Sequence, residues 1–231
     1  MFGTLFIVAT PIGNLQDITL RAINILKKVN YIACEDTRKT GTLLKSLGIE
    51  NHHMLVSYYE QVEMARIPNI LNILKNGQDL ALISDSGTPG ISDPGFRLVR
   101  LALEEGINVI SIPGPSAVVS ALVSSGLPTD KFIFLGFLPK KEGKRLKLLR
   151  NLKEANSNLE ATAVIYEAPH KLVKTLKSLQ EVFGNLEITL MRELTKIHEE
   201  RINDNVENLK KKYETEAVRG EFVILFSPKI L

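Results

Sequence analysis

The stretch "LALISDSGTPGISDPG", residues 80–95, says more about the fold than any other part of the chain, because an apolar run ends in a long polar loop. Residues 84–95 contain three Gly, two Pro, two Asp, three Ser and one Thr in twelve positions. Glycine lets a backbone approach a ligand closely, and proline fixes the shape of a loop before anything binds. The pattern therefore predicts a buried strand whose carboxyl end carries a binding loop.

Similar apolar runs recur along the chain, with helical patterns between them. Strands that alternate with helices indicate βαβ units and a parallel sheet. Around "HEERI" (198–202) two strand-like runs lie close together with little helical pattern between them, so antiparallel pairing is expected there. The expected strands cover residues 4–10, 31–35, 54–58, 80–84, 108–113, 132–137, 162–168, 186–193 and 220–227. The expected helices of the second half cover residues 144–155, 170–183 and 206–214.

Two helices of the first half have features that can be assigned from spacing. One is expected to begin near Asp17, whose side chain can act as an N-cap. Another places Phe96, Val99 and Leu103 on a single face, which is the spacing of an amphipathic helix.

The length and composition fit a globular protein with two domains. The chain has 231 residues, of which 44% are hydrophobic and 24% are charged, enough to bury a core in each of two small domains. The predicted fold class is α/β. Residues 1–117 form an N-terminal α/β domain with a largely parallel sheet, and residues 118–231 form a C-terminal α/β domain with a mixed sheet.

Charge and cysteine content exclude several classes of protein. A net charge of +3 permits an acidic partner without demonstrating one. Cys34 is the only cysteine, which excludes an internal disulfide framework and a thiolate metal site; its place in a strand predicts a small core residue. No apolar stretch approaches the roughly 18–20 residues of a membrane span, and the start of the chain lacks the basic segment of an export signal. We therefore expect a cytoplasmic protein.

Special loops follow several of the expected strands at their carboxyl ends. They are "TPIGN" (10–14), "EDTR" (35–38), residues 84–95, "PGPSA" (113–117) and, in the second half, "YEAPH" (166–170). Ligands of open parallel sheets bind at this edge, so the loops predict a pocket for a polar molecule of about the size of adenosine. Each loop alone is also compatible with a simple tight turn. The glycine patterns that bind pyrophosphate and the helical motifs that bind catalytic metals are absent.

Several motifs occur in an order that resembles one family. They are "VATPIGNLQDITLRA", "CEDTR", "SDSGTPGISDPGFRLV", "IPGPSA", "SGLPTDKFIFLGFLPKK", "YEAPHKL", "RELTKIHEE" and "RGEFVILF". Together they resemble the small-subunit ribosomal RNA cytidine 2′-O-methyltransferases of the tetrapyrrole methylase superfamily, from about residue 4 to residue 227. The resemblance implies S-adenosylmethionine as methyl donor in a cleft between two α/β domains, a homodimer, and a cytidine in the decoding region of the small ribosomal subunit as substrate.

The same motifs imply which residues lie near the cofactor. By motif position these are Pro11, Ser84, Asp85, Gly87, Thr88, Ile91, Ser92, Asp93, Pro113, Ser116, Ala117, Tyr166, Glu167 and Ala168. The segment "SYYEQVE" (57–63) departs from the family, which has a His and an Asn there, so the roles of Tyr59, Gln61 and Val62 toward substrate are open. Ala168 and Lys171 likewise stand where the family has Ser and Arg.

Methyl transfer to a ribose hydroxyl requires alignment of donor and acceptor and a group that accepts the hydroxyl proton. The candidates are the carboxylates at the sheet edge, namely Glu35, Asp36, Asp85, Asp93 and Glu167. We favour Glu35 or Asp36 on the substrate side, with Arg38 able to hold a phosphate. The alternative is that Asp36 and Arg38 form a structural ion pair that caps the next helix.

A basic segment, "PKKEGKRLKLLRNLK" (139–153), predicts a helix with leucines on its inner face and cations on its outer face. The expected RNA contacts are Lys140, Lys141, Lys144, Arg145 and Lys147. The alternative is a solvated charged helix, and "KKK" (210–212) fits that alternative better. His170 either approaches substrate or begins the following helix.

Two other functions are alternatives to rRNA methylation. A tetrapyrrole or other small-molecule methyltransferase would share the cofactor, but the basic segment and the "EDTR" and "RELTKIHEE" motifs argue against it. A non-catalytic ribosome-assembly protein of the same fold would not need the intact loops at 84–95 and 113–117.

Overall fold

The structure, a computed structural model, describes residues 1–50 and 53–227. The chain divides into two compact units, Met1–Ser116 and Ala117–Leu231, so the division falls one residue before the boundary expected at residue 117. Each unit has its own five-stranded sheet.

The sheet of the first unit is entirely parallel. Its strands are β1 (Thr4–Val8), β2 (Tyr31–Cys34), β3 (Met54–Ser57), β4 (Leu80–Leu82) and β5 (Asn108–Ile112). Their order in the sheet is β3-β2-β4-β1-β5. All four neighbouring pairs run parallel, which confirms the expected βαβ organisation of the first half. Because the strands are parallel, the loops that follow them all leave from one edge of the sheet.

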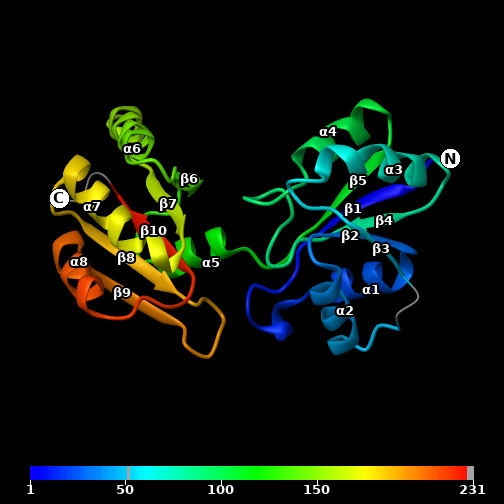
Figure 1. The fold of residues 1–231 in the computed structure, drawn as a ribbon, viewed down its shortest axis with the longest axis horizontal. Helices are drawn as coiled ribbons and strands as arrows, with labels where there is room; N and C mark the ends of the chain where they lie inside the picture. The colour runs from blue at the N-terminus through cyan, green and yellow to red at the C-terminus, as the bar shows by residue number, and fades with distance from the viewer. Residues whose placement is uncertain (51–52, 228–231) are drawn as a thin grey trace. The chain divides into compact units, whose positions relative to one another are not determined.

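Helices cover both faces of this sheet (Figure 1). They are α1 (Leu20–Lys28), α2 (Thr37–Ser46), α3 (Glu63–Lys75) and α4 (Phe96–Glu104), with a short 3-10 helix at Leu15–Asp17. Leu26 of α1 and Leu44 of α2 pack against one face, where Cys34 is buried in the core as predicted. Ile70 of α3 and Leu98 of α4 pack against the other. Because helices cover both faces, the edge from which the strand-end loops leave is where a ligand is expected.

Two local predictions about these helices were wrong. Helix α1 begins at Leu20, and its N-cap is Thr19, whose hydroxyl accepts from the Ala22 amide; Asp17 ends the preceding 3-10 helix instead. In α4 the buried residues are Leu98 and Ala102, whereas Phe96 and Leu103 are exposed. The helix therefore turns a neighbouring stripe of its surface toward the core.

The sheet of the second unit is mixed, as predicted. Its strands are β6 (Phe132–Phe137), β7 (Thr162–Glu167), β8 (Glu187–Arg192), β9 (Glu200–Asn205) and β10 (Phe222–Phe226). Their order is β6-β7-β10-β8-β9. Only β6 and β7 pair in parallel; β8 and β9 pair antiparallel, which confirms the expectation drawn from the region around "HEERI".

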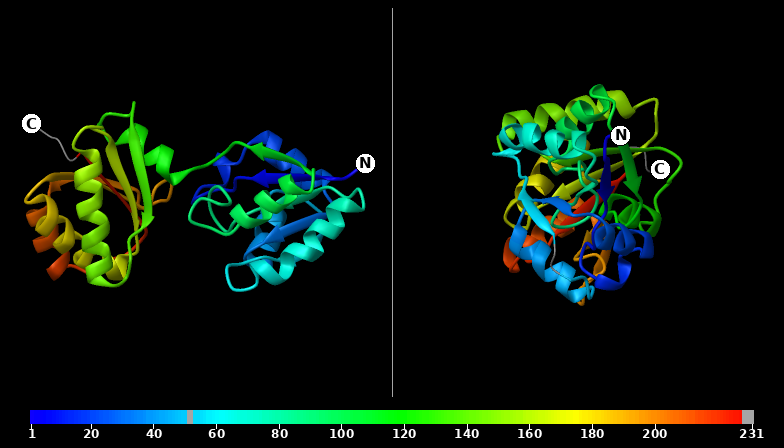
Figure 2. Two further views of the ribbon diagram at one scale, coloured as in Figure 1. Left: turned by 90° about the horizontal axis from the view of Figure 1, so that it is seen from above. Right: turned by 90° about the vertical axis from the view of Figure 1, so that its right-hand side faces the viewer.

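Three long helices pack on this sheet and a fourth contacts β10. They are α5 (Ala117–Ser124), α6 (Glu142–Asn156), α7 (Leu172–Phe183) and α8 (Val206–Thr215), with a 3-10 helix at Pro169–Lys171. Figure 2 shows α6 running along the sheet of its unit. Leu149 and Leu152 of α6 are buried in the core shared with α7 and α8, as the sequence pattern predicted. Among the described residues, no helix combines the length and apolarity needed to cross a membrane.

Candidate ligand site at the carboxyl edge of the first sheet

The loop at 84–95 is joined to the end of β1 by a short antiparallel bridge. The Thr10 amide donates to the Gly87 carbonyl at 2.9 Å, and the Gly87 amide donates to the Thr10 carbonyl at 3.1 Å. The buried Thr10 hydroxyl also donates to the Ser84 carbonyl at 3.1 Å. Gly87 has a φ of 85°, a backbone conformation that residues with a side chain rarely adopt. The glycine therefore allows the loop to fold back onto β1.

The loop after β5 reaches the same place. The Thr88 hydroxyl donates to the Pro115 carbonyl at 3.2 Å. Gly114 lies so close to the end of β1 that a Cβ there would be 3.0 Å from the Cβ of Ala9. Pro113 is exposed and Ser116 is half-buried beside this contact. The loops after β1, β4 and β5 therefore converge within the first unit.

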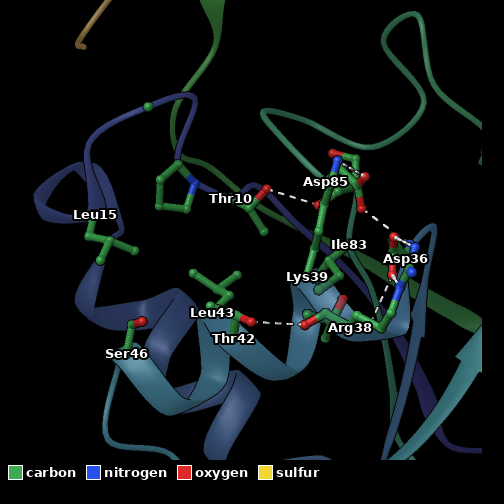
Figure 3. A pocket seen from close by; sticks show the side chains of 14 residues that line it. Thr10, Leu15, Asp36, Arg38, Lys39, Thr42, Leu43, Ser46, Ile83 and Asp85 are labelled. Atoms are coloured by element: carbon green, nitrogen blue, oxygen red, sulfur yellow. Dashed lines mark hydrogen bonds and ion pairs between the residues drawn. The ribbon is translucent and has the colours of Figure 1, made fainter. Parts of the chain in front are cut away.

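A pocket of about 640 Å³ opens at this edge between the loop after β1, helix α2 and the loop after β4 (Figure 3). Leu15 and Leu43 supply its apolar wall, and the Thr42 hydroxyl donates to the Arg38 carbonyl at 3.0 Å. The lining residues are Thr10, Pro11, Gly13, Leu15, Asp36, Arg38, Lys39, Thr40, Thr42, Leu43, Ser46, Ile83, Ser84 and Asp85. The contribution of α2 was not predicted, because nothing in its sequence marks Thr42, Leu43 or Ser46 as different from ordinary helix residues.

Asp36 and Arg38 form the ion pair that the sequence left open as an alternative. One Asp36 oxygen accepts from the Arg38 amide and Nε, and the other lies 2.7 Å from Arg38 Nη2. Asp36 is the N-cap of α2. The Arg38 guanidinium holds the pKa of this carboxyl well below its usual range, so Asp36 is a poor proton acceptor at neutral pH. The Arg38 side chain is 90% exposed at the pocket, where its outer edge faces solvent.

Asp85 also has a cationic partner. Its Oδ2 lies 2.7 Å from Lys39 Nζ, and its Oδ1 accepts from the Asp36 amide at 3.2 Å. The Asp85 amide in turn donates to Glu35 Oε1 at 3.1 Å. These bonds tie the loop after β2 to the loop after β4. Lys39 follows Arg38 directly in the sequence, but its pairing across 46 positions could not be predicted from the chain alone.

Glu35 and Asp93 differ from Asp36 and Asp85 in having no ion pair with a described Lys or Arg. Burial raises the pKa of Glu35, and the Asp85 charge raises it further. Burial, followed by the Glu35 charge, raises the pKa of Asp93 from 3.8 to about 7. Asp93 therefore changes its charge near neutral pH, which is unusual for an aspartate and typical of carboxyls that transfer protons.

The outer part of the 84–95 loop lines a second hollow of about 290 Å³. Ser92 has a φ of 63° and lies there beside Asp93, whereas Ile91 is 45% exposed. The loop thus directs the two residues of its "SD" pair toward a concave surface.

Glu63 is a buried carboxylate that no sequence motif marks as part of the site. It is 5% exposed and accepts from the Tyr58 hydroxyl at 2.7 Å, the Gly95 amide at 3.3 Å and Arg97 Nη1 at 3.1 Å. Its three donors come from the end of β3, the 84–95 loop and the first turn of α4. Glu63 thereby anchors the end of the binding loop to α3.

The remaining predicted cofactor residues belong to the second unit. Tyr166 packs edge-on against Phe134 and Phe137, with ring centroids 4.8 and 5.6 Å away. The Glu167 carboxylate is 2% exposed and accepts from the Thr175 hydroxyl and the Ala168 amide. Both oxygens of the Glu167 carboxylate accept hydrogen bonds from residues of the same unit, which favours a structural role for this residue. Ala117 is the first residue of α5.

The basic segment forms α6 and the loop before it, with one correction. Lys140, Lys141, Lys144 and Lys147 are exposed, as predicted. Arg145 is 6% exposed, so it does not belong to the outer basic face. The inner face formed by the leucines is confirmed, but Arg145 lies on the same helical side as Leu149 and Leu152, four and seven residues further on.

No group of three or more His, Cys, Asp and Glu side chains in residues 1–50 and 53–227 has a geometry that could hold a metal ion.

The first unit has a pocket at the edge of its sheet that is lined by loops, carboxyls and hydroxyls. Such a pocket is typical of α/β proteins that bind a small polar ligand beyond the carboxyl ends of their strands.

The chain belongs to the tetrapyrrole (corrin/porphyrin) methylase family, whose model matches residues 4–210. It is 45% identical over 227 residues to a protein of Hydrogenobaculum sp. (strain Y04AAS1) named ribosomal RNA small subunit methyltransferase I, covering 96% of this chain and 95% of that protein. It is 43% identical to the protein of the same name from Thermotoga maritima, covering 98% of this chain and 99% of that one.

Solved structures share the fold at much lower identity. The cobalamin biosynthetic enzyme cobalt precorrin-4 methyltransferase superposes with a TM-score of 0.69 at 16% identity, covering 96% of this chain and 93% of that one. Uroporphyrin-III-C-methyltransferase from Thermus thermophilus superposes with a TM-score of 0.64 at 18% identity, covering 99% and 94%. The expected tetrapyrrole methylase fold is thereby confirmed.

Proposed function

We propose that this protein transfers the methyl group of S-adenosylmethionine to the ribose 2′-hydroxyl of a cytidine in the decoding region of small-subunit ribosomal RNA. The observation that carries the proposal is the 43–45% identity, over nearly the whole chain, to proteins named ribosomal RNA small subunit methyltransferase I. The cytidine and its 2′-oxygen come from the resemblance of the motifs described above. That resemblance also supports a homodimer, which light scattering of the purified protein tests.

The residues at the edge of the first sheet fit S-adenosylmethionine. When bound, this cofactor supplies a methyl group attached to a positively charged sulfur. Ser84 and Asp85 line the pocket and offer a hydroxyl and a carboxyl group to its polar substituents. Carboxyls suit a cationic ligand, and the apolar wall at Leu15 suits a flat base.

We assign the proton-accepting role to Asp93. A group that accepts a proton in the transition state works best when its pKa lies near the working pH, and Asp93 meets this condition through burial and the neighbouring Glu35 charge. Asp36, one of the two carboxylates favoured from the sequence, does not meet it, because Arg38 lowers its pKa. Glu35 keeps its place in the site as the charge that raises the pKa of Asp93.

The experiment uses methyl-labelled S-adenosylmethionine with small ribosomal subunits from a strain that lacks the corresponding gene, and with porphyrinogens in parallel. We expect label in the RNA and none in the porphyrinogens. Label in the porphyrinogens alone would show that the acceptor belongs to the tetrapyrrole class. Calorimetry with S-adenosylmethionine separates both outcomes from a non-catalytic protein, for which no binding at high micromolar cofactor is expected.

A further inference from the structure

The second unit contains a basic pocket at the carboxyl edge of its parallel strand pair. It has a volume of about 250 Å³. Because β6 and β7 run parallel, the loops that follow them leave from the same edge of the sheet, and both contribute to the pocket. Its lining residues are Leu138, Pro139, Lys140, Arg145, Glu167, His170, Lys171, Lys174 and Thr175.

Arg145 connects the elements that form this pocket. Its Nε donates to the Ser178 hydroxyl at 2.8 Å, and its Nη1 donates to the carbonyls of Pro139 and Lys140 at 3.4 and 3.3 Å. The guanidinium thus joins α6 to α7 and holds the loop after β6 against both. Its Nη2 makes no hydrogen bond with any other residue of the described chain. A side chain that is 6% exposed therefore brings an unused donor group to a pocket that it lines.

The other cations of the pocket are not neutralised by carboxylates. Lys140, Lys171 and Lys174 form no ion pair with any residue at 1–50 or 53–227, and Lys171 Nζ instead lies 5.9 Å from the centre of the Phe137 ring. Among the described residues that line the pocket, Glu167 is the only acidic one, and its two oxygens accept from the Thr175 hydroxyl and the Ala168 amide. Four positive charges and one negative charge therefore surround a space that has hydrogen-bond donors on several sides.

Two cations elsewhere on α6 and α7 do have carboxylate partners. On the same two helices, Arg150 pairs with Glu181 and Lys177 pairs with Glu214, each at 2.9 Å. Cations that do not have a counter-ion on the protein repel one another, and an anionic ligand removes that repulsion.

We propose that the pocket formed by Lys140, Arg145, His170, Lys171 and Lys174 binds a phosphodiester group of the RNA substrate. The proposal rests on the proposed function. It adds to the RNA contact predicted for the outer face of α6 a second contact, in the pocket between the loops that follow β6 and β7. A guanidinium edge and converging ammonium groups bind phosphate oxygens through charge-assisted hydrogen bonds. The carboxylate of the cofactor has related chemistry, so the experiment distinguishes it from RNA.

The test compares two triple variants with the wild-type protein. The first replaces Lys140, Lys171 and Lys174 by alanine; these residues lie at the surface or half-buried, so the fold is expected to be retained, and circular dichroism checks this. The matched control replaces Lys210, Lys211 and Lys212 of α8 by alanine. It removes the same charge from the same unit, but at lysines that bind Gln180, Glu207 and Glu200. Binding of small ribosomal subunits is measured between 50 and 200 mM salt, and binding of S-adenosylmethionine is measured by calorimetry.

We expect the pocket variant to bind subunits about tenfold more weakly and with a shallower salt dependence, because one phosphate contact is worth roughly that factor. The control is expected to match the wild type, and both variants are expected to bind S-adenosylmethionine normally. Equal subunit affinity in the pocket variant and the control would overturn the proposal. Weakened cofactor binding with normal subunit binding would also overturn it, because the pocket would then hold the cofactor carboxylate. If the wild-type protein leaves rRNA unlabelled, the proposed function fails independently of these variants.

Discussion

Replacement of Asp93 by asparagine is expected to raise stability and to lower activity, because the folded protein disfavours the charged form of this carboxyl. Burial and the Glu35 charge raise its pKa from 3.8 to about 7 in the folded protein. A carboxyl whose folded pKa is raised favours folding only while it is protonated. Its contribution to stability is complete below pH 3.8 and is lost as the pH rises through about 7.

Before solvent screening is considered, the rise in the pKa of Asp93 from 3.8 to about 7 corresponds to a free energy of about 4 kcal/mol. Asp93 is only partly buried, and solvent screening reduces the figure to about 1–2 kcal/mol. Asparagine has the same shape and carries no charge, so Asp93→Asn is expected to unfold at a temperature about 2–8 °C higher at pH 8. Near pH 4 the two proteins are expected to unfold at nearly the same temperature.

Activity is expected to change in the opposite direction. Loss of a positioned proton acceptor lowers kcat by about 10²–10⁴-fold, and kcat/KM of the wild type is expected to rise with pH up to about 7. Thermal unfolding followed by circular dichroism at several pH values, together with methyl-transfer rates, measures both effects. Asp85→Asn is the control: this carboxyl is paired with Lys39, so its loss is expected to bring no gain in stability. An Asp93→Asn protein that is less stable at pH 8, or that keeps activity within tenfold of the wild type, would refute the assignment.

Three further predictions concern the binding loop and the basic helix. Glu63→Ala removes the acceptor of three donors and is expected to lower the free energy of unfolding by about 2–4 kcal/mol; urea unfolding measures this, and a change below 0.5 kcal/mol would contradict the anchoring role. Gly87→Ala is expected to cost about 1–2 kcal/mol, because alanine is strained at a φ of 85°, and to weaken S-adenosylmethionine binding in calorimetry; unchanged values of both would show that the loop tolerates a side chain. Charge reversal at Lys144 and Lys147 is expected to weaken subunit binding and to reduce its salt dependence without altering cofactor affinity, and equal subunit affinity would count against an outer RNA contact on α6.

The sequence predicted the architecture well because the relevant signals are local. Apolar runs such as residues 80–84 and the helical patterns between them fix the order of elements, and parallel pairing then brings the strand-end loops to one edge. The contacts from Thr10 to Gly87 and from Thr88 to Pro115 agree with the predicted convergence of these loops.

The failures arose where a side chain finds a distant partner. Nothing near Arg145 in the chain shows that its guanidinium reaches Ser178 across two helices, so the residue was predicted to be exposed. Likewise, Asp85 and Asp93 belong to one loop, but one pairs with Lys39 while the other is buried beside Glu35. Identical side chains eight positions apart thus have different surroundings, and only the three-dimensional arrangement shows which is which.

The most direct test of the central proposal is mass spectrometry of nucleosides from small-subunit RNA incubated with this protein and labelled S-adenosylmethionine. The proposal predicts that the label appears in 2′-O-methylcytidine and that Asp93→Asn strongly reduces it. Label on a base, on a nucleoside other than cytidine, or in no RNA product would contradict the proposal.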